Sequence, residues 1–560
     1  MRVSEGLLAI RATGIAALGF AAVLACAPAA APPAAGPAAP GAPAAPAPPA
    51  AEPQRGGVLV WASRSVLPNL HPLKGDIALV RGINAIYEPL VRLDHRAGLN
   101  YTVDWEVKPG LAQRWEQPNP TTIVFSLVKN AKWHDGQPFT ADDVVFTLQT
   151  WQDLKQAIRG NEMGKLFADV AKVDDSTVRL TLKAPSVELL SDMGYLSGQP
   201  FIIPKHAADN LERVSVGTGP FKAKSIDPKS FVIVERNPDY WQPGKPYLDG
   251  GKILQGIEPS TIQAAFIAKE MDFMNAADKV QHDTIKAAAP SLQAQPFAFG
   301  LSIHYYPRQD RPPFDDIRVR RAIHLALDRP AMHKALTFGE GAINPPGGVG
   351  ARKGWGIPQE ELQTMPGWRQ PKDQDLAEAK RLLAEAGYPA GLKFTARYNG
   401  NDFNAPKQAE ASAPMLRAVG LEVTLDPMDR AASVKAEQDG DYAVFLPIAA
   451  DVKPNVRLNQ YFHSKGPFAR QAGINDAKLD ALIERQDQTF DVAERKKLFY
   501  DFQKIIYENM YAIPMISFAS YNLWYPWLKD YPSSYSPDPY PPAWENMWMD
   551  PKQAPQRTLG

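Results

Sequence analysis

Every residue from Ala27 to Ala51 is alanine, proline or glycine, and this run constrains the fold more than any other feature of the chain. Proline has no backbone N–H and fixes φ, so a proline-rich run can build neither a helix interior nor a sheet ladder. The run also has no charged or aromatic side chain with which to recognise a partner, which disfavours a disordered interaction module. We therefore expect a semi-extended, solvated spacer between a short head and a folded body that begins near Arg55.

The head in front of the spacer has the pattern of a secretory signal peptide. An apolar stretch from Gly14 to Ala25 follows the basic residues Arg2 and Arg11, and it is too short to span a bilayer. The run Val23-Leu24-Ala25-Cys26 resembles the bacterial lipobox, in which the cysteine is acylated and becomes the first residue of the mature chain.

The cysteine count favours an anchoring role for Cys26, because it is the one cysteine of the sequence and no internal disulfide can form. Two or more acyl chains hold a protein stably at a membrane. The sequence thus predicts a lipoprotein signal peptide at residues 1–25 and a lipidated cysteine with its Ala/Pro-rich tether at 26–54. The expected location is the periplasmic or cell-surface side of a bacterial membrane. The alternative is a secreted protein from which Cys26 has been cleaved.

The body has the composition of a globular protein without affinity for polyanions. Hydrophobic residues make up 45% of the chain, and lysine plus arginine balance aspartate plus glutamate at 61 each, so we expect no nucleic-acid partner. No Gly-x-Ser-x-Gly elbow, His-Glu-x-x-His helix or phosphate loop occurs, and the nine histidines are dispersed. The sequence therefore predicts a protein that is not an enzyme and that has no cofactor and no metal site.

Strand and helix patterns alternate along the body, which predicts an α/β fold with mixed sheets. Alternating apolar residues predict half-buried strands at residues 121–128, 178–183, 231–235, 393–398 and 421–426. Helical spacing of apolar residues, with caps, predicts helices at residues 140–148, 375–386 and 492–506.

Short motifs follow one another in a fixed order through this body. They are Arg55-Gly56-Gly57, Tyr87-Glu88-Pro89-Leu90, Pro109-Gly110-Leu111, Trp133-His134-Asp135-Gly136, Gly217-Thr218-Gly219-Pro220-Phe221, Asn237-Pro238-Asp239-Tyr240-Trp241, Arg318-Val319-Arg320-Arg321 and Ala384-Glu385-Ala386-Gly387-Tyr388-Pro389. In this order they resemble family 5 solute-binding proteins, the extracytoplasmic receptors of oligopeptide, dipeptide and nickel ABC importers. Turn and cap chemistry gives most of these residues a structural role.

The resemblance implies a two-lobed class II periplasmic-binding-protein fold with an extra inserted subdomain of the cluster C type and a hinge of two chain crossings. The expected domain ranges are 55–94, 200–303 and 517–560 for lobe I, 95–199 for the inserted subdomain, and 304–516 for lobe II.

The resemblance also implies where a ligand binds. Peptide receptors of this family meet the α-ammonium group with an aspartate that follows a buried strand of the second lobe, and Asp451 occupies that place. They commonly carry tryptophan three residues earlier, where this chain has Ile448. The segment from Lys74 to Ile77 corresponds to backbone that pairs with an extended peptide.

Three aromatic residues complete the predicted binding site. Tyr305 and Tyr306 lie where the chain is expected to cross between the lobes, and Trp355 lies in a glycine-rich loop at the expected edge of the cleft. For each of these rings, packing in a core or at a hinge is the use that the sequence favours over ligand contact.

The expected function is that of a monomeric substrate-binding lipoprotein that captures a di- or oligopeptide by lobe closure. Its partners are then the permease and ATPase subunits of an ABC importer. Two alternatives remain open: the same fold with a non-peptide solute, such as an oligosaccharide, an opine or a metal chelate, and a surface hydrolase or adhesin.

Overall fold

The structure is a computed structural model that describes residues 52–67, 69–74, 83–94, 106–153, 163–194, 200–298, 301–348, 354–450, 454–531 and 544–559. The chain divides into two compact units, and the described helices and strands all belong to the unit Pro53–Gly560. The predicted signal peptide and most of the predicted tether lie outside the described ranges, as do the predicted site residues Cys26, Ile77 and Asp451.

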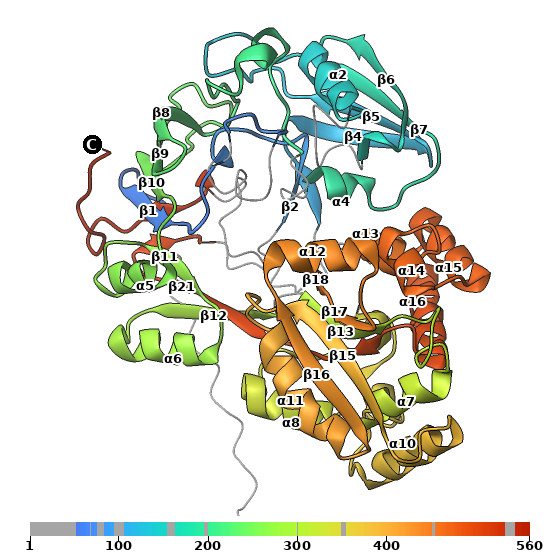
Figure 1. Ribbon diagram of the computed structural model, residues 1–560. Helices are drawn as coiled ribbons and strands as arrows, with labels where there is room; N and C mark the ends of the chain where they lie inside the picture. Colours follow the sequence, from blue (N-terminus) through green and yellow to red (C-terminus); the bar gives the residue numbers. More distant parts are fainter. Residues whose placement is uncertain are drawn as a thin grey trace, which may run out of the picture. The chain divides into compact units, whose positions relative to one another are not determined.

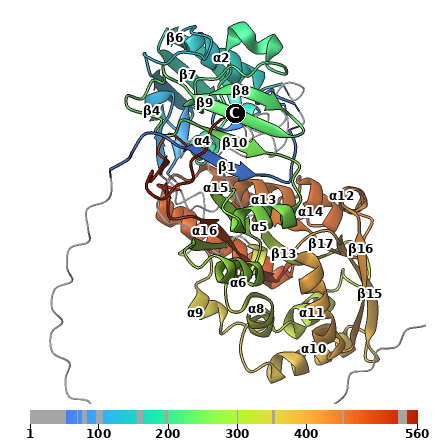
Figure 2. The ribbon, with the colours of Figure 1, turned by 90° about the vertical axis from the view of Figure 1, so that its left-hand side faces the viewer.

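A four-stranded sheet in the order β1-β10-β9-β8 begins the body (Figure 2). Its strands are β1 (Val58–Ala62), β8 (Phe221–Asp227), β9 (Phe231–Arg236) and β10 (Gly250–Leu254). Strand β1 is parallel to β10, and the other pairs are antiparallel. Strand β9 alternates buried and more exposed side chains at its start, which confirms the strand predicted at 231–235.

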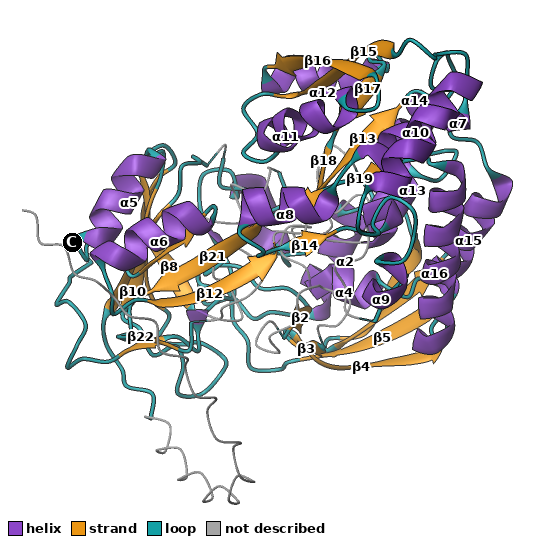
Figure 3. Ribbon diagram, turned by 90° about the horizontal axis from the view of Figure 1, so that it is seen from below, coloured by secondary structure: helices purple, strands orange, loops and turns teal. Residues whose placement is uncertain are grey.

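A neighbouring three-stranded antiparallel sheet has the order β11-β21-β12, with α5 and α6 packed against it (Figure 3). Its elements are β11 (Phe273–Ala276), β12 (Gln293–Ala298), β21 (Ala519–Trp524), α5 (Pro259–Ile267) and α6 (Lys279–Ala288). Strand β21 thus returns from far along the chain to pair with both β11 and β12. Side chains from both sheets share one hydrophobic core, which includes Trp61, Phe273 and Trp544.

A second four-stranded sheet is antiparallel and has the order β4-β5-β7-β6 (Figure 1). Its strands are β4 (Ala112–Asn119), β5 (Thr122–Leu127), β6 (Phe167–Asp174) and β7 (Thr177–Leu182), and helix α2 (Ala141–Thr150) contacts β6 and β7. Thr140 and Asp143 form the capping box at the start of α2, so the predicted strands and helix of this region are confirmed.

The core of this second sheet extends beyond the range predicted for the inserted subdomain. Leu90 and Val91 belong to it on one side, and Ile202, Ile203 and Leu211 belong to it on the other. The boundaries at 95 and 199 therefore stay predictions.

The largest sheet has the order β16-β15-β17-β13-β18, with β19 also paired to β13. Its strands are β13 (Leu301–Pro307), β15 (Leu392–Asn399), β16 (Leu421–Met428), β17 (Val444–Leu446), β18 (Ile448–Ala450) and β19 (Ile513–Pro514). The helices of this region are α7 (Ile317–Ala326), α8 (Arg329–Thr337), α10 (Asp373–Glu385), α11 (Ala405–Arg417) and α12 (Arg430–Asp439). Helix α10 confirms the helix predicted at 375–386. It ends just before Gly387, whose φ of 93° is typical of a glycine that terminates a helix.

A group of helices packs around a core of its own. They are α13 (Pro454–Tyr461), α14 (Pro467–Ala472), α15 (Ala477–Gln488) and α16 (Val492–Asn509). The short helix α9 (Gln359–Leu362) precedes α10 and belongs to a smaller core with Trp368. Helix α16 buries Phe499, Phe502 and Ile506 on one side, as the spacing of its apolar residues predicts, whereas Val492 at its start is exposed.

Short elements connect these parts. They are β2 (Val91–Leu93), β3 (Val107–Pro109), β14 (Ala342–Ile343), β20 (Ile516–Ser517), β22 (Leu528–Lys529), β23 (Trp548–Met549), α4 (Leu189–Gly194), η4 (Lys205–Asn210) and η5 (Pro346–Gly348). Among the described residues, none of the helices has the length and apolar character that a membrane span needs. Nor do the described ranges contain a group of three His, Cys, Asp or Glu residues that could hold a metal ion.

Candidate functional site

Three of the sequence motifs meet at one buried carboxylate, that of Glu88. Its Oε1 accepts a hydrogen bond of 2.8 Å from the Tyr240 hydroxyl, and its Oε2 accepts bonds of 2.9 Å from Trp241 Nε1 and from Thr218 Oγ1. The Glu88 side chain is fully buried, so these donors replace the water that an ionised carboxylate needs. The geometry therefore gives the motifs around residues 88, 218 and 240 the structural role that turn and cap chemistry favours.

Arg92 supplies the counter-charge for this carboxylate. Its Nη2 pairs with Glu88, and its Nη1 lies 2.6 Å from Oε1 of Glu545, which is also buried. Burial raises the pKa of Glu545, and the nearby Arg92 guanidinium opposes that rise. The cluster places one guanidinium between two carboxylates, and it ties a residue near the end of the chain to one near its start.

His134 holds the glycine-rich loop that carries Thr218. Its Nδ1 lies 3.3 Å from the Gly217 N–H, and its Nε2 lies 3.0 Å from the Gly219 carbonyl oxygen. This pairing requires a neutral ring with the proton on Nε2, and burial lowers the pKa of His134 to about 4. At pH 7 the His134 ring is therefore uncharged, and its two hydrogen bonds hold this loop in place.

Two chain segments pass between the β11-β21-β12 sheet and the largest sheet. Strand β12 pairs with β21, and β13, which follows it in the chain, pairs with β17, β18 and β19. On the return, β20 pairs with β14, and β21 then enters the sheet of β11 and β12. These are the two crossings that the sequence predicts for a hinge.

Tyr305 and Tyr306 lie on β13 at this crossing and are both buried. The Tyr305 hydroxyl lies 2.6 Å from Ser412 Oγ, and burial raises the pKa of Tyr305 to about 12. The Tyr306 hydroxyl donates to the carbonyl of Tyr461, and the two rings pack edge to face at 5.9 Å. Contact of either ring with a ligand stays a prediction.

Trp355 is also buried, and it packs on α16. Its ring lies edge to face with Phe499 at a centroid distance of 5.2 Å, and the guanidinium carbon of Arg495 lies 5.6 Å from its centroid. Trp355 thus helps to position Arg495, and its contact with a ligand stays a prediction as well.

A second connection joins the β4-β5-β7-β6 sheet region to the helices α15 and α16. Glu188, in the segment after β7, pairs with Arg495 of α16, and both side chains are buried. Next to this pair, the N–H of Val187 donates to the carbonyl of Asp487 on α15 at 3.0 Å. We name the contact formed by Val187, Glu188, Asp487 and Arg495 the α15–α16 contact.

Sequence reasoning did not identify the α15–α16 contact, although one signal for it exists. Arg495 precedes Leu498, Phe499 and Phe502 at helical spacing and therefore lies on the apolar face of α16, where an unpaired guanidinium would be costly. A charged residue on such a face predicts a buried partner. Glu188 has no comparable signal, because nothing in its local pattern identifies the residue that it faces.

One cavity adjoins the segment predicted to pair with an extended peptide. It has a volume of about 550 Å³ and includes His71, Lys74, Phe146 and Glu212 in its lining. Lys74 Nζ lies 3.0 Å from Glu212 Oε1. Burial and the nearby Lys74 lower the pKa of His71 to about 4. The cavity therefore presents a neutral imidazole, an ion pair and an aromatic ring beside the start of the 74–77 segment.

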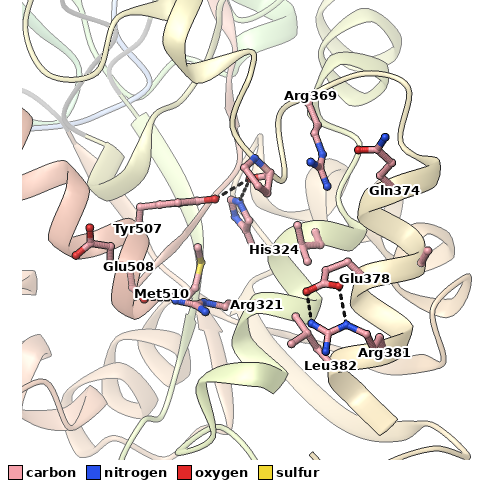
Figure 4. Close-up of a pocket in the computed structure, with 13 residues that line it drawn as sticks. Arg321, His324, Arg369, Gln374, Glu378, Arg381, Leu382, Tyr507, Glu508 and Met510 are labelled. Carbon is pink, nitrogen blue, oxygen red and sulfur yellow. Dashed lines mark hydrogen bonds and ion pairs between the residues drawn. The ribbon is translucent and has the colours of Figure 1, made fainter. Parts of the chain in front are cut away.

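A larger cavity of about 760 Å³ lies among α7, α10 and the end of α16, and it includes none of the predicted site residues (Figure 4). Arg381 in its wall pairs with Glu378, and Arg369 pairs with the buried Asp375. Carboxylates of this chain thus already neutralise two of its guanidinium groups. This leaves little net charge with which to attract an anion.

Comparison with known proteins identifies the family. Residues 106–467 match the family of bacterial extracellular solute-binding proteins, family 5. This chain belongs to that family, whose members bind solutes.

Two curated relatives have 25% identity or slightly more. The periplasmic oligopeptide-binding protein OppA of Escherichia coli K12 is 26% identical over 463 residues, which cover 77% of this chain and 82% of OppA. The glutathione-binding protein GsiB of the same organism is 25% identical over 415 residues, which cover 70% of this chain and 77% of GsiB.

Solved structures show the same fold. The ABC transporter substrate-binding protein CtaP of Listeria monocytogenes matches with a TM-score of 0.74 at 21% identity, over 89% of this chain and all of that structure. This likeness, with the mixed sheets described above, confirms the expected two-lobed α/β fold of the periplasmic binding proteins.

Proposed function

We propose that this chain is the substrate-binding component of an ABC importer and that it captures a di- or oligopeptide between its two lobes. Membership of solute-binding family 5 is the observation that carries the proposal. The two strand crossings at β12–β13 and β20–β21 fit a hinge, because they are the covalent links between the sheets on either side. A ligand that contacts both lobes stabilises the closed state by the contacts that it gains there. The protein releases its ligand unaltered.

The proposed ligand class rests on the curated relatives and on the position of Asp451. One relative is named for oligopeptides and another for glutathione. Strand β18 ends at Ala450 and pairs with β13, so Asp451 directly follows a strand at the crossing side of the largest sheet. A carboxylate there would meet the α-ammonium group of a peptide, and a charge-assisted hydrogen bond of this kind contributes roughly 1.5–3 kcal/mol.

Asp451→Asn should weaken the binding of peptides with a free amino terminus by more than tenfold, because the substitution removes the charge and keeps the shape. The probe is a tetrapeptide library. Native mass spectrometry identifies the members that bind, and calorimetry then measures their dissociation constants.

The same peptides with acetylated amino termini are the matched control for this prediction. They should bind the parent weakly and should lose no further affinity in Asp451→Asn. Equal affinity of parent and variant for the free-amine peptides would remove Asp451 from the site. Release of cleaved peptides would contradict a binding protein and support the hydrolase alternative.

A non-peptide solute is the second candidate, and Ile448 favours it. Peptide receptors of the family commonly have tryptophan at this position, three residues before the proposed carboxylate, where this chain has a smaller aliphatic residue. Recovery of an oligosaccharide, an opine or a metal chelate from the purified protein, together with no binding of the peptide library, would establish this candidate in place of the first.

The proposed partners are a membrane permease and its ATPases, and the proposed anchor is a lipid on Cys26. A chain with Cys26→Ser should move almost entirely from the membrane fraction to the soluble extracytoplasmic fraction, because no other cysteine can be acylated. Fractionation with immunodetection checks this. Retention of the variant in the membrane fraction would show that something other than Cys26 anchors the chain.

A further inference from the structure

We propose that the α15–α16 contact is a latch that holds the lobes closed. We propose further that the latch is strengthened when the Asp487 carboxylate binds a proton. The proposal rests on the proposed function for its consequence, since a closed receptor retains its ligand. The latch itself would act in the absence of any ligand.

The contact lies apart from the hinge. The crossings are made by residues near 300 and 517, whereas the latch joins the segment after β7 to the helices α15 and α16. Closing two lobes about a hinge brings together surfaces that lie away from it. A bond between such surfaces therefore favours the closed arrangement over an open one.

Burial strengthens the electrostatic attraction between Glu188 and Arg495. Both side chains are at most 7% exposed, so water screens their attraction little. Separation of the lobes would break this attraction, and the hydration that each charge then regains offsets part of the loss. Arg495 also stacks near Trp355 and Phe499, which hold the guanidinium in one place on the helix side.

Asp487 makes the latch sensitive to protons. Its side chain is partly buried, and this removal from water raises its pKa to about 7; the nearby Glu188 acts in the same direction. The Asn459 amide at 3.1 Å and the charge of Arg495 oppose the rise. Gln486 beside it also contacts the guanidinium of Arg495, at 3.2 Å from Nη2.

The neighbours of Asp487 determine whether acid favours the closed or the open state. Below pH 7 Asp487 carries a proton, and the latch contains one carboxylate and one guanidinium. Above pH 7 a second, partly buried carboxylate is present beside Glu188, and opening the contact hydrates it more fully. Closing therefore binds a proton, so acid favours the closed state. Between pH 8.5 and pH 5.5 one such proton shifts the ratio of closed to open molecules by up to about thirtyfold.

Pulsed spin-label distance measurements on the ligand-free chain test the latch. Cys26 is the one cysteine of the sequence, so a Cys26→Ser chain accepts two labels at chosen positions. Ala168 on β6 and Ala384 on α10 are exposed and lie on the two sides of the contact. We expect one short distance at pH 5.5 and a growing longer distance at pH 8.5.

Three substitutions test the ion pair of the latch, its protonation and an exposed control pair. Glu188→Gln should increase the ratio of open to closed molecules at least tenfold at both pH values. Asp487→Asn, which stays uncharged, should keep the short distance at both. Arg485→Gln removes an exposed ion pair between the same two helices, with Glu494, and should behave as the parent. Circular dichroism confirms that each variant is folded.

An unchanged distance distribution in folded Glu188→Gln would overturn the latch. A pH response that persists in Asp487→Asn would overturn its control by this proton. Neither result depends on peptide binding, so failure of the latch is distinct from failure of the proposed function.

Discussion

Glu88→Ala should lower the free energy of unfolding by about 3–5 kcal/mol, because it removes the acceptor of three hydrogen bonds and a buried donor without an acceptor costs about 1–3 kcal/mol. The substitution leaves buried donors on Tyr240 and Thr218, and a part-buried donor on Trp241, without their acceptor. It also leaves Arg92 with Glu545 as its counter-charge in the cluster. Urea unfolding followed by tryptophan fluorescence measures the loss.

Glu116→Ala is the control, because Glu116 pairs with Arg114 on the exposed surface of β4. A pair of this kind contributes at most about 1 kcal/mol. If Glu88→Ala costs no more than Glu116→Ala, the buried cluster does not stabilise the fold. Glu88→Gln should fall between the two, since the amide keeps the shape and one oxygen acceptor while it removes the charge.

Gly217→Ala should destabilise the protein by about 3 kcal/mol, at the upper end of the usual cost of overpacking. A Cβ atom at this position would lie 1.9 Å from the carbonyl oxygen of Ile86. That oxygen belongs to the backbone and accepts a hydrogen bond from the Gly219 N–H, so it cannot move without loss of this bond. Thermal and urea unfolding should both report the change.

Gly136→Ala separates steric overlap from backbone strain. Gly136 lies in the same region with a φ of 92°, and an added Cβ there meets nothing within 4 Å. Its substitution should cost about 1–2 kcal/mol, from the unfavourable φ alone. A similar cost for both variants would show that the loop around Gly217 adjusts freely.

The local elements were predictable because their signals are local. The alternation of residues 122–127 reflects one buried face of β5, and Thr140 with Asp143 marks the start of α2. The order of the family motifs then indicated the arrangement of the sheets. Each of these signals lies within a few residues of the element that it describes.

The tertiary contacts of single side chains were not predictable in the same way. Glu88 was recognised as part of a motif, but its partners at 218, 240 and 241 come together through folding. Arg495 had a signal on its own helix, whereas Glu188, 307 positions away, had none. A pairing of this kind depends on the relative position of two sheets, which no local pattern encodes.

The predicted site residues divide in the same way. Tyr305, Tyr306 and Trp355 were selected for their place along the chain, and the structure shows them packed in cores, with the tyrosine hydroxyls hydrogen-bonded. Asp451 and Ile77 lie outside the described residues, so their role depends on the binding experiments.

The position of β21 between β11 and β12 has a consequence for biogenesis. Strands β11 and β12 are synthesised long before β21, and each of them pairs with β21. The sheet therefore stays incomplete until residues 519–524 have been synthesised. Completion of this sheet is thus a late step for a chain that folds as it is made, because its central strand comes from residues 519–524.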